Sequence, residues 1–198
     1  MAQRDLEAQA SLTRDVGARL RQAREDHGVS LRTLAQDIEV SPSLLSQIEN
    51  GLARPSVGTL WAIVSALGVS LDRVFDVSSA AATAAGAAEP VVQRAGDRQV
   101  IELSGGVRWE RLDASHDPDV VFAFITYEPG AESEVRPPAR HRGREYGYLV
   151  SGRLAIEVDD QRVEVGPGDS VSFDSRHPHR FSAVGDEVAA AVWFNLGR

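Results

Sequence analysis

The chain has 198 residues, 42% hydrophobic and 25% charged, the composition of an ordinary soluble globular protein with one large domain or two small ones. It has no cysteine, so disulfides, thiolate nucleophiles and zinc sites with cysteine ligands are excluded. No apolar run approaches the ~20 residues of a membrane span, and the polar N-terminus has no signal-peptide pattern, so we expect a cytoplasmic protein without a membrane partner.

Charge is distributed unevenly along the chain. The net charge of −8 by itself argues against a nucleic-acid partner. Residues 1–75, however, hold 8 Arg and 9 acidic residues, whereas residues 76–198 hold 13 Arg and 20 acidic residues. The first half can therefore still carry a local basic face.

Apolar spacing predicts a series of short helices between residues 11 and 76. We expect the first over residues 16–28, ending at Gly28, and the second over residues 31–40, capped by Ser30. Both place their apolar side chains on one face, which indicates packing against neighbouring helices.

The third predicted helix begins with Ser41 as its cap and Pro42 at its first position, where a missing N–H costs nothing, and it ends at Gly51. A fourth helix is predicted over residues 55–68 and a short fifth over residues 70–76. Five short helices are thus expected in the first part of the chain.

The second and third predicted helices are joined by a tight turn, an arrangement that lays the later helix in the major groove of DNA. On that later helix the polar side chains are expected to face away from the apolar set Leu44, Leu45 and Ile48. Such polar groups can reach base edges, and glutamine can bond adenine twice. Free N–H groups at helix starts can hold phosphates, and Arg54 can add a charged contact.

The segment from Arg19 to Phe75 resembles the XRE-type helix-turn-helix of bacterial and phage repressors, with "LAQ", "SQIENG", "RPS" and "LGVS" in their expected order. The resemblance implies a five-helix, lambda-repressor-like domain that binds a double-stranded DNA operator. The residues expected at the DNA are Ser30, Ser41, Pro42, Ser43, Ser46, Gln47, Asn50 and Arg54. Two alternatives stay open: a helical bundle that does not bind DNA, and a helix-turn-helix retained inside an enzyme.

A linker is predicted over residues 77–89, which are small, mostly uncharged and without periodicity. It divides the chain into a helical domain of residues 1–76 and a second domain of residues 90–198. In this second domain the hydrophobic period changes to two, and nine short runs separated by turn signals predict an antiparallel β-sandwich or β-barrel. The runs are "RQVIEL", "VRWERL", "VVFAFITYE", "GYLVSG", "RLAIEV", "QRVEV", "SVSF", "HRFSAV" and "VAAAVWF".

A metal site is predicted near the middle of this β domain. His141 and Glu145 lie at even spacing, so on a strand they share one face, and the "RHPHRF" segment offers His177 and His179 as a third ligand. Two histidines and one carboxylate suit iron, manganese, nickel or zinc. The alternative is a set of surface histidines, with Glu145 paired to a neighbouring arginine.

The β domain resembles a cupin, a jelly-roll barrel. The first cupin motif is matched by Gly130, His141, Glu145 and Gly152, and the second by Gly168 and His179. Two positions depart from the family: Ala139 stands where many cupins have their first histidine, and Ala183 where an asparagine is usual. The resemblance implies that His141, Glu145 and His179 hold a divalent metal and contact a small-molecule effector.

The whole sequence therefore predicts a multidomain α + β protein that regulates transcription as a homodimer and senses an effector through its cupin. The alternative is a mononuclear iron enzyme, similar to the epoxidase that makes fosfomycin, with a retained helix-turn-helix. A group of arginines surrounds the first cupin motif and forms either a solvated rim or a guide for an anionic effector; its members are Arg136, Arg140, Arg142 and Arg144.

Overall fold

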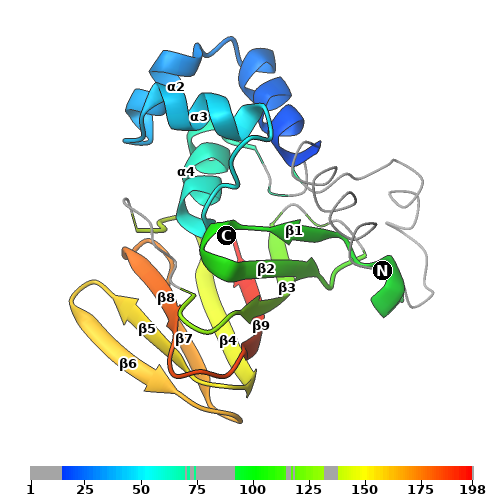
Figure 1. Cartoon of the computed structure of the whole chain (residues 1–198), viewed down its shortest axis with the longest axis vertical. Helices are drawn as coiled ribbons and strands as arrows, with labels where there is room; N and C mark the ends of the chain where they lie inside the picture. The colour runs from blue at the N-terminus through cyan, green and yellow to red at the C-terminus, as the bar shows by residue number, and fades with distance from the viewer. Residues whose placement is uncertain are drawn as a thin grey trace.

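The computed structural model describes residues 15–69, 71, 74, 92–114, 117, 119–131 and 138–197. It joins a helical part to a β part, as predicted (Figure 1). The predicted linker, residues 77–89, lies outside the described residues, and so does most of the predicted fifth helix. No helix in the described part of the chain is long and apolar enough to cross a membrane.

The helical part has four described helices. A first helix covers residues 15–26, and α2 (Leu31–Asp37), α3 (Pro42–Glu49) and α4 (Val57–Leu67) follow. The predicted starts are confirmed. The Ser30 hydroxyl accepts a hydrogen bond from an N–H in the first turn of α2, the Ser41 hydroxyl does the same in α3, and Pro42 occupies the first position of α3. Glycines of positive φ follow the ends of the first helix, α3 and α4, namely Gly28, Gly51 and Gly68.

One predicted core residue of α3 is not buried. Leu44 is 38% exposed, whereas Leu45 and Ile48 are buried as expected. The reason is that Leu45, Ile48 and Glu49 follow the i, i+3, i+4 spacing of one helix face, and this leaves Leu44 at the edge of that face.

The inner face of α3 instead contains a buried charge. The carboxylate of Glu49 accepts hydrogen bonds from Nε and Nη2 of Arg24, at 2.6 and 2.8 Å, in the helix of residues 15–26. The pKa of Arg24 is raised because it donates these bonds to Glu49. Gly17 brings the same helix close to the end of α3: a Cβ at residue 17 would lie 2.2 Å from the carbonyl oxygen of Ile48. The two contacts fix α3 against the first helix.

The β part contains all nine predicted strands, which form two antiparallel sheets. The larger sheet has the order β1-β2-β3-β9-β4-β7, and the smaller has the order β6-β5-β8. The strands are β1 (Val100–Glu102), β2 (Val107–Arg111), β3 (Val120–Tyr127), β4 (Arg144–Ser151), β5 (Leu154–Val158), β6 (Gln161–Val165), β7 (Ser170–Asp174), β8 (His179–Ala183) and β9 (Ala189–Leu196).

The inner faces of both sheets share one core, to which Ile125, Leu154, Ile156, Phe181 and Trp193 belong. Strand β4 has a glycine where it crosses the Trp193 ring, because a Cβ at this position would lie 2.5 Å from that ring. This architecture is the predicted antiparallel cupin barrel.

Helix α4 lies against one end of the barrel (Figure 1). Its Val57 and Trp61 line the barrel interior together with residues of the strands. The Trp61 ring meets the Trp109 ring of β2 edge to face, at a centroid distance of 6.3 Å. Just before α4, the carbonyl of Pro55 accepts a hydrogen bond of 2.9 Å from the N–H of Ser104. The helical part is thus docked directly on the barrel.

Candidate functional site

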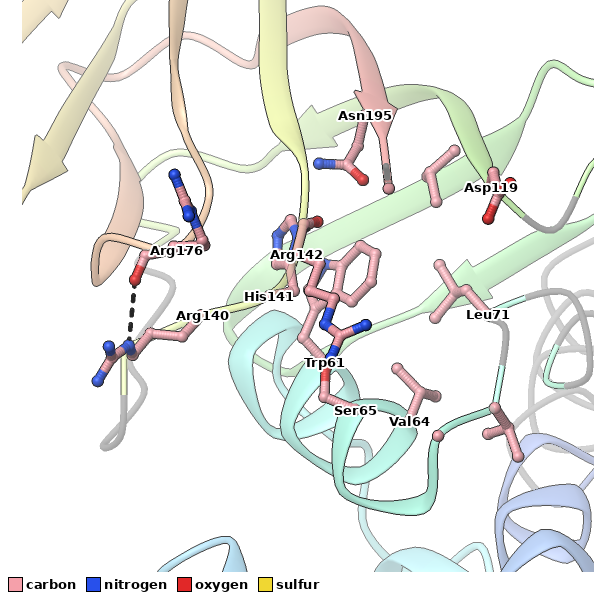
Figure 2. A pocket seen from close by; sticks show the side chains of 14 residues that line it. Trp61, Val64, Ser65, Leu71, Asp119, Arg140, His141, Arg142, Arg176 and Asn195 are labelled. Carbon is pink, nitrogen blue, oxygen red and sulfur yellow. Dashed lines mark hydrogen bonds between the residues drawn. The ribbon is translucent and has the colours of Figure 1, made fainter.

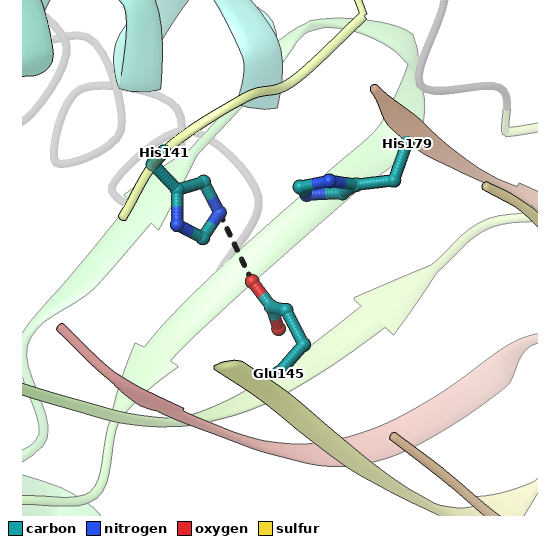
Figure 3. Close-up of side chains that lie close together, drawn as sticks. All are labelled: His141, Glu145 and His179. Carbon is teal, nitrogen blue, oxygen red and sulfur yellow. Dashed lines mark ion pairs between the residues drawn. The ribbon is translucent and has the colours of Figure 1, made fainter. Parts of the chain in front are cut away.

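Three predicted ligands converge inside the barrel. Glu145 belongs to β4, His179 begins β8, and His141 precedes β4. Their side chains point toward one another (Figure 3), and one potential ligand atom from each lies within 4.8 Å of the others. All three residues are buried. The backbone positions them, because Ala139 pairs with His179 in a β-bridge and the N–H of His141 donates to the Ser175 carbonyl at 3.0 Å.

The two imidazoles of this cluster are oriented by their Nδ1 atoms. Nδ1 of His141 lies 3.2 Å from the Arg142 carbonyl oxygen, and Nδ1 of His179 lies 2.9 Å from the His177 carbonyl oxygen. A carbonyl only accepts hydrogen bonds, so each Nδ1 carries a proton, and in the neutral form of each imidazole Nε2 has a free lone pair. This is the tautomer in which histidine binds a metal through Nε2.

The cluster places two electron-pair donors face to face. Nε2 of His141 lies 3.1 Å from a carboxylate oxygen of Glu145, and it has no hydrogen-bond partner within the described structure. Two buried acceptors at this distance repel one another unless a cation or a shared proton lies with them. Burial lowers the pKa of His179 and favours its neutral form, although the charge of Glu145 acts in the opposite sense. The residues present therefore fit a divalent metal.

The second histidine of the "RHPHRF" segment does not join the cluster. His177 is exposed, and its Nδ1 lies 2.7 Å from a carboxylate oxygen of Asp159 in the β5–β6 turn. Of the two predicted candidates only His179 is a possible ligand. Residues on a strand alternate between its faces, but His177 precedes β8 and lies in a bend, where that alternation does not apply.

Aromatic rings surround the ligands. Trp61 of α4 stacks on His141 with a centroid distance of 3.8 Å and an interplanar angle of 15°. Phe173 packs on His179 at 5.0 Å. A cavity of only about 20 Å³, room for about one water molecule, lies inside the barrel and is lined by Trp61, Glu145 and His179 among others.

A larger cavity, of about 510 Å³, lies between α4 and the mouth of the barrel (Figure 2). The stacked pair Trp61 and His141 forms part of its wall. Arg140 and Arg142, predicted to form either a solvated rim or a guide for an anionic effector, line this cavity. Arg176, which was not predicted there, lines it as well. Arg144 is exposed as expected, and Arg136 lies outside the described residues.

Six of the eight predicted DNA-contacting residues lie on α3 or at its caps, whereas Ser30 caps α2 and Arg54 lies between α3 and α4. Most of them are exposed, and Ser46 is partly buried; the exposed set is Ser30, Ser41, Pro42, Ser43, Gln47, Asn50 and Arg54. The Asn50 amide already donates a hydrogen bond of 2.7 Å to the Ser46 carbonyl. Ser43 and Gln47 lie one helical turn apart and are free to reach one groove.

Comparison with known proteins agrees with both halves of this description. A helix-turn-helix family profile (HTH_3) matches residues 20–74, and a cupin domain profile (Cupin_2) matches residues 123–195. The chain thus combines a helix-turn-helix domain of the XRE type with a cupin domain. It is 28% identical over 168 residues to the HTH-type transcriptional regulator PuuR of Escherichia coli (strain K12), a match that covers 84% of this chain and 86% of PuuR.

The fold of this helix-turn-helix–cupin chain also occurs in solved structures. The crystal structure of an HTH_3 family transcriptional regulator from Vibrio cholerae is similar, with a TM-score of 0.70 and 23% identity over 95% of this chain and 98% of that one. Hydroxypropylphosphonic acid epoxidase from S. wedmorenis aligns with a TM-score of 0.49 and 17% identity over 93% of this chain and 98% of that one, a likeness too low to support a shared activity. The comparisons favour a regulator over the predicted alternative of an iron enzyme.

Proposed function

We propose that the protein is a DNA-binding transcriptional regulator whose cupin domain senses a small molecule. The observation that carries this proposal is α3, which follows α2 after a tight turn and presents Ser43 and Gln47 to solvent. This is the helix that a helix-turn-helix inserts into the major groove. The regulator PuuR, which shares both parts of the chain, supports the same function. We place the protein in the cytoplasm, because its operator lies there.

We further propose a homodimer with domains of residues 1–76 and 90–198 joined by a linker of residues 77–89. A palindromic operator needs two recognition helices about one DNA turn apart, roughly 34 Å. The outer face of the larger sheet supports a dimer, because exposed aromatic side chains gather there, including Phe122 and Tyr146, both next to Phe194. An exposed apolar face of this kind is typical of a protein interface.

The buried cluster is proposed as a divalent metal site. His141, Glu145 and His179 would be its protein ligands, and iron, manganese, nickel and zinc all accept this donor set. Bound there, the metal would supply open coordination positions for water or another small oxygen donor. The chain's own residues orient the two imidazoles through carbonyl groups and exclude water with Trp61 and Phe173.

The regulator proposal is tested by selecting operator fragments from the host genome with the full-length protein and measuring affinity at several salt concentrations. Gln47→Ala should cost about 1–3 kcal/mol at one base position. Arg54→Ala should weaken all sequences alike and reduce the salt slope by about 1. Gln161→Ala and Arg153→Ala, on exposed barrel positions, are the matched controls. A protein that prefers no genomic fragment over random DNA is not this regulator.

A further inference from the structure

The volumes of the two cavities restrict where an organic effector can bind. The barrel interior, with about 20 Å³, is too small for an organic molecule. The cavity between α4 and the barrel mouth, with about 510 Å³, lies in the range of small-molecule sites. His141 and Trp61 form part of its wall, so a ligand there contacts the edge of the metal cluster without entering the barrel.

The two walls of this interdomain cavity differ in character. Helix α4 and the residues after it give an apolar wall that includes Trp61, Val64 and Leu71. The barrel mouth gives a cationic wall of three arginines, Arg140, Arg142 and Arg176. Among the described lining residues, Asp119 is the one acidic residue.

The three arginines of this wall are engaged to different degrees. Arg176 is paired with Asp174, and Nε of Arg140 donates to the Arg176 carbonyl. In the described structure no hydrogen bond or ion pair engages the guanidinium of Arg142. Arg142 is therefore available to bind an anion through two parallel bonds.

We propose that this interdomain cavity is the effector site and that it binds a small organic anion with an apolar body. The anionic group would meet Arg142 and its neighbouring arginines, and the apolar body would lie against Trp61 and Val64. An effect of this site on operator binding rests on the proposed regulator function. Binding of the anion in the cavity does not depend on that function.

The site is built from both domains, and this gives it a route to the DNA. A ligand in the cavity contacts α4 on one side and the barrel on the other. It therefore stabilises the arrangement in which α4 is docked on the barrel. The free energy of this stabilisation equals the difference between the ligand's binding free energies for the docked and undocked arrangements. Helix α4 packs in the same core as α3, so the position of the recognition helix changes with it.

Binding is tested by calorimetry and tryptophan fluorescence on the full-length protein. The probes are phenylacetate, phenyl phosphate and the neutral phenylacetamide. We expect saturable binding of one or both anions at about 1 mM or below, and binding of the amide at least about 10-fold weaker. The two anions distinguish a carboxylate site from a phosphate site. Absence of saturable binding of both anions up to about 10 mM overturns the proposal, and so does equal affinity for the amide.

Location is tested with matched variants. Ser65→Phe places a ring in the cavity from α4 and should abolish binding, whereas Ala66→Phe adds the same ring at an exposed neighbouring position that does not line the cavity. Arg142→Gln should weaken binding about 10-fold, and Arg144→Gln, outside the cavity, should leave it unchanged. Equal thermal unfolding of the variants shows that they are folded. Unchanged binding by Ser65→Phe would place the ligand elsewhere.

A final measurement separates this inference from the regulator proposal. Operator affinity is measured with and without the anion that binds. A shift in wild type that is absent in Ser65→Phe supports both. If the protein binds the anion but no operator, the regulator proposal fails and the cavity assignment stands.

Discussion

Replacing Glu49 by glutamine should destabilise the helical domain strongly. The Glu49 side chain is 3% exposed and that of Arg24 10% exposed. Two parallel hydrogen bonds of 2.6 and 2.8 Å join them, and Nη1 of Arg24 also donates to the Val29 carbonyl at 2.9 Å. Glutamine has nearly the same shape as glutamate but no charge, so the variant keeps the packing and removes only the compensation of the guanidinium.

The magnitude follows from the burial of the remaining charge. Breaking a buried ion pair by removal of one partner costs about 3–5 kcal/mol, because the other charge remains in a low-dielectric site. Replacing both partners by apolar residues of similar size costs much less. We therefore expect Glu49→Gln to lose about 3–5 kcal/mol of unfolding free energy. The double variant Arg24→Met/Glu49→Leu should lose clearly less than the single variant.

Urea unfolding followed by far-ultraviolet circular dichroism measures this loss, since the helical signal comes from the domain that contains the pair. The control is Glu25→Gln, which removes an exposed carboxylate that pairs with Arg21 at 2.8 Å and lies 3.6 Å from Nη2 of Arg24. It should change the midpoint much less than Glu49→Gln, because exposed ion pairs contribute little. A loss below about 1 kcal/mol for Glu49→Gln, or a larger loss for the double variant, would refute the argument that the charge is buried and uncompensated.

Further predictions concern the metal cluster, the helix contact and the dimer. Glu145→Gln should lower the affinity for iron, manganese, nickel and zinc in calorimetric titrations, because an amide is a poor ligand for a divalent cation. Ala139→His should raise this affinity, because residue 139 pairs directly with His179 and its side chain lies on the same face. Gly17→Ala should cost about 1–3 kcal/mol in urea unfolding, since its Cβ would overlap a backbone carbonyl of α3. A fragment of residues 90–198 should remain a folded dimer in sedimentation, and Tyr146→Arg should make the full-length protein monomeric while Val163→Arg, on β6, does not.

A different result in each experiment would contradict these predictions. If wild type binds none of the four metals and Ala139→His gains nothing, the cluster is a set of hydrogen-bonding groups and no metal site. A folded but monomeric fragment would place the dimer interface elsewhere. A Gly17→Ala variant with wild-type stability would mean that the first helix and α3 can separate without loss.

Local signals explain what the sequence could predict. Strands alternate with period two and are separated by glycine and aspartate turns, so all nine were found. Helix starts were found through serine caps, because a cap bonds its own first turn and needs no distant partner. The proximity of His141 and Glu145 could be predicted because both lie in one short segment at even spacing, and that of His179 through the cupin resemblance.

Contacts between distant segments explain what the sequence could not predict. Arg24 and Glu49 look like solvated charges in the sequence, and only the crossing of two helices buries them against each other. The stacking of Trp61 on His141 joins the two domains, and helical spacing alone assigns Trp61 to a helix face without indicating a partner. The place of Arg176 in the cavity wall could not be predicted for the same reason, because it enters from the distant turn between β7 and β8.

The position of Trp61 has a consequence for how the two sites depend on one another. Its ring stacks on His141, a proposed metal ligand, and also lines the interdomain cavity. A metal in the cluster and an effector in the cavity would therefore act on the same side chain. A metal that fixes the His141 ring also fixes the surface on which Trp61 stacks, and a docked α4 in turn keeps water from His141. By linkage, an effector that favours docking must then raise metal affinity by the same factor by which the metal raises effector affinity. Metal affinities measured with and without phenylacetate would therefore report the coupling of the two sites in the absence of DNA.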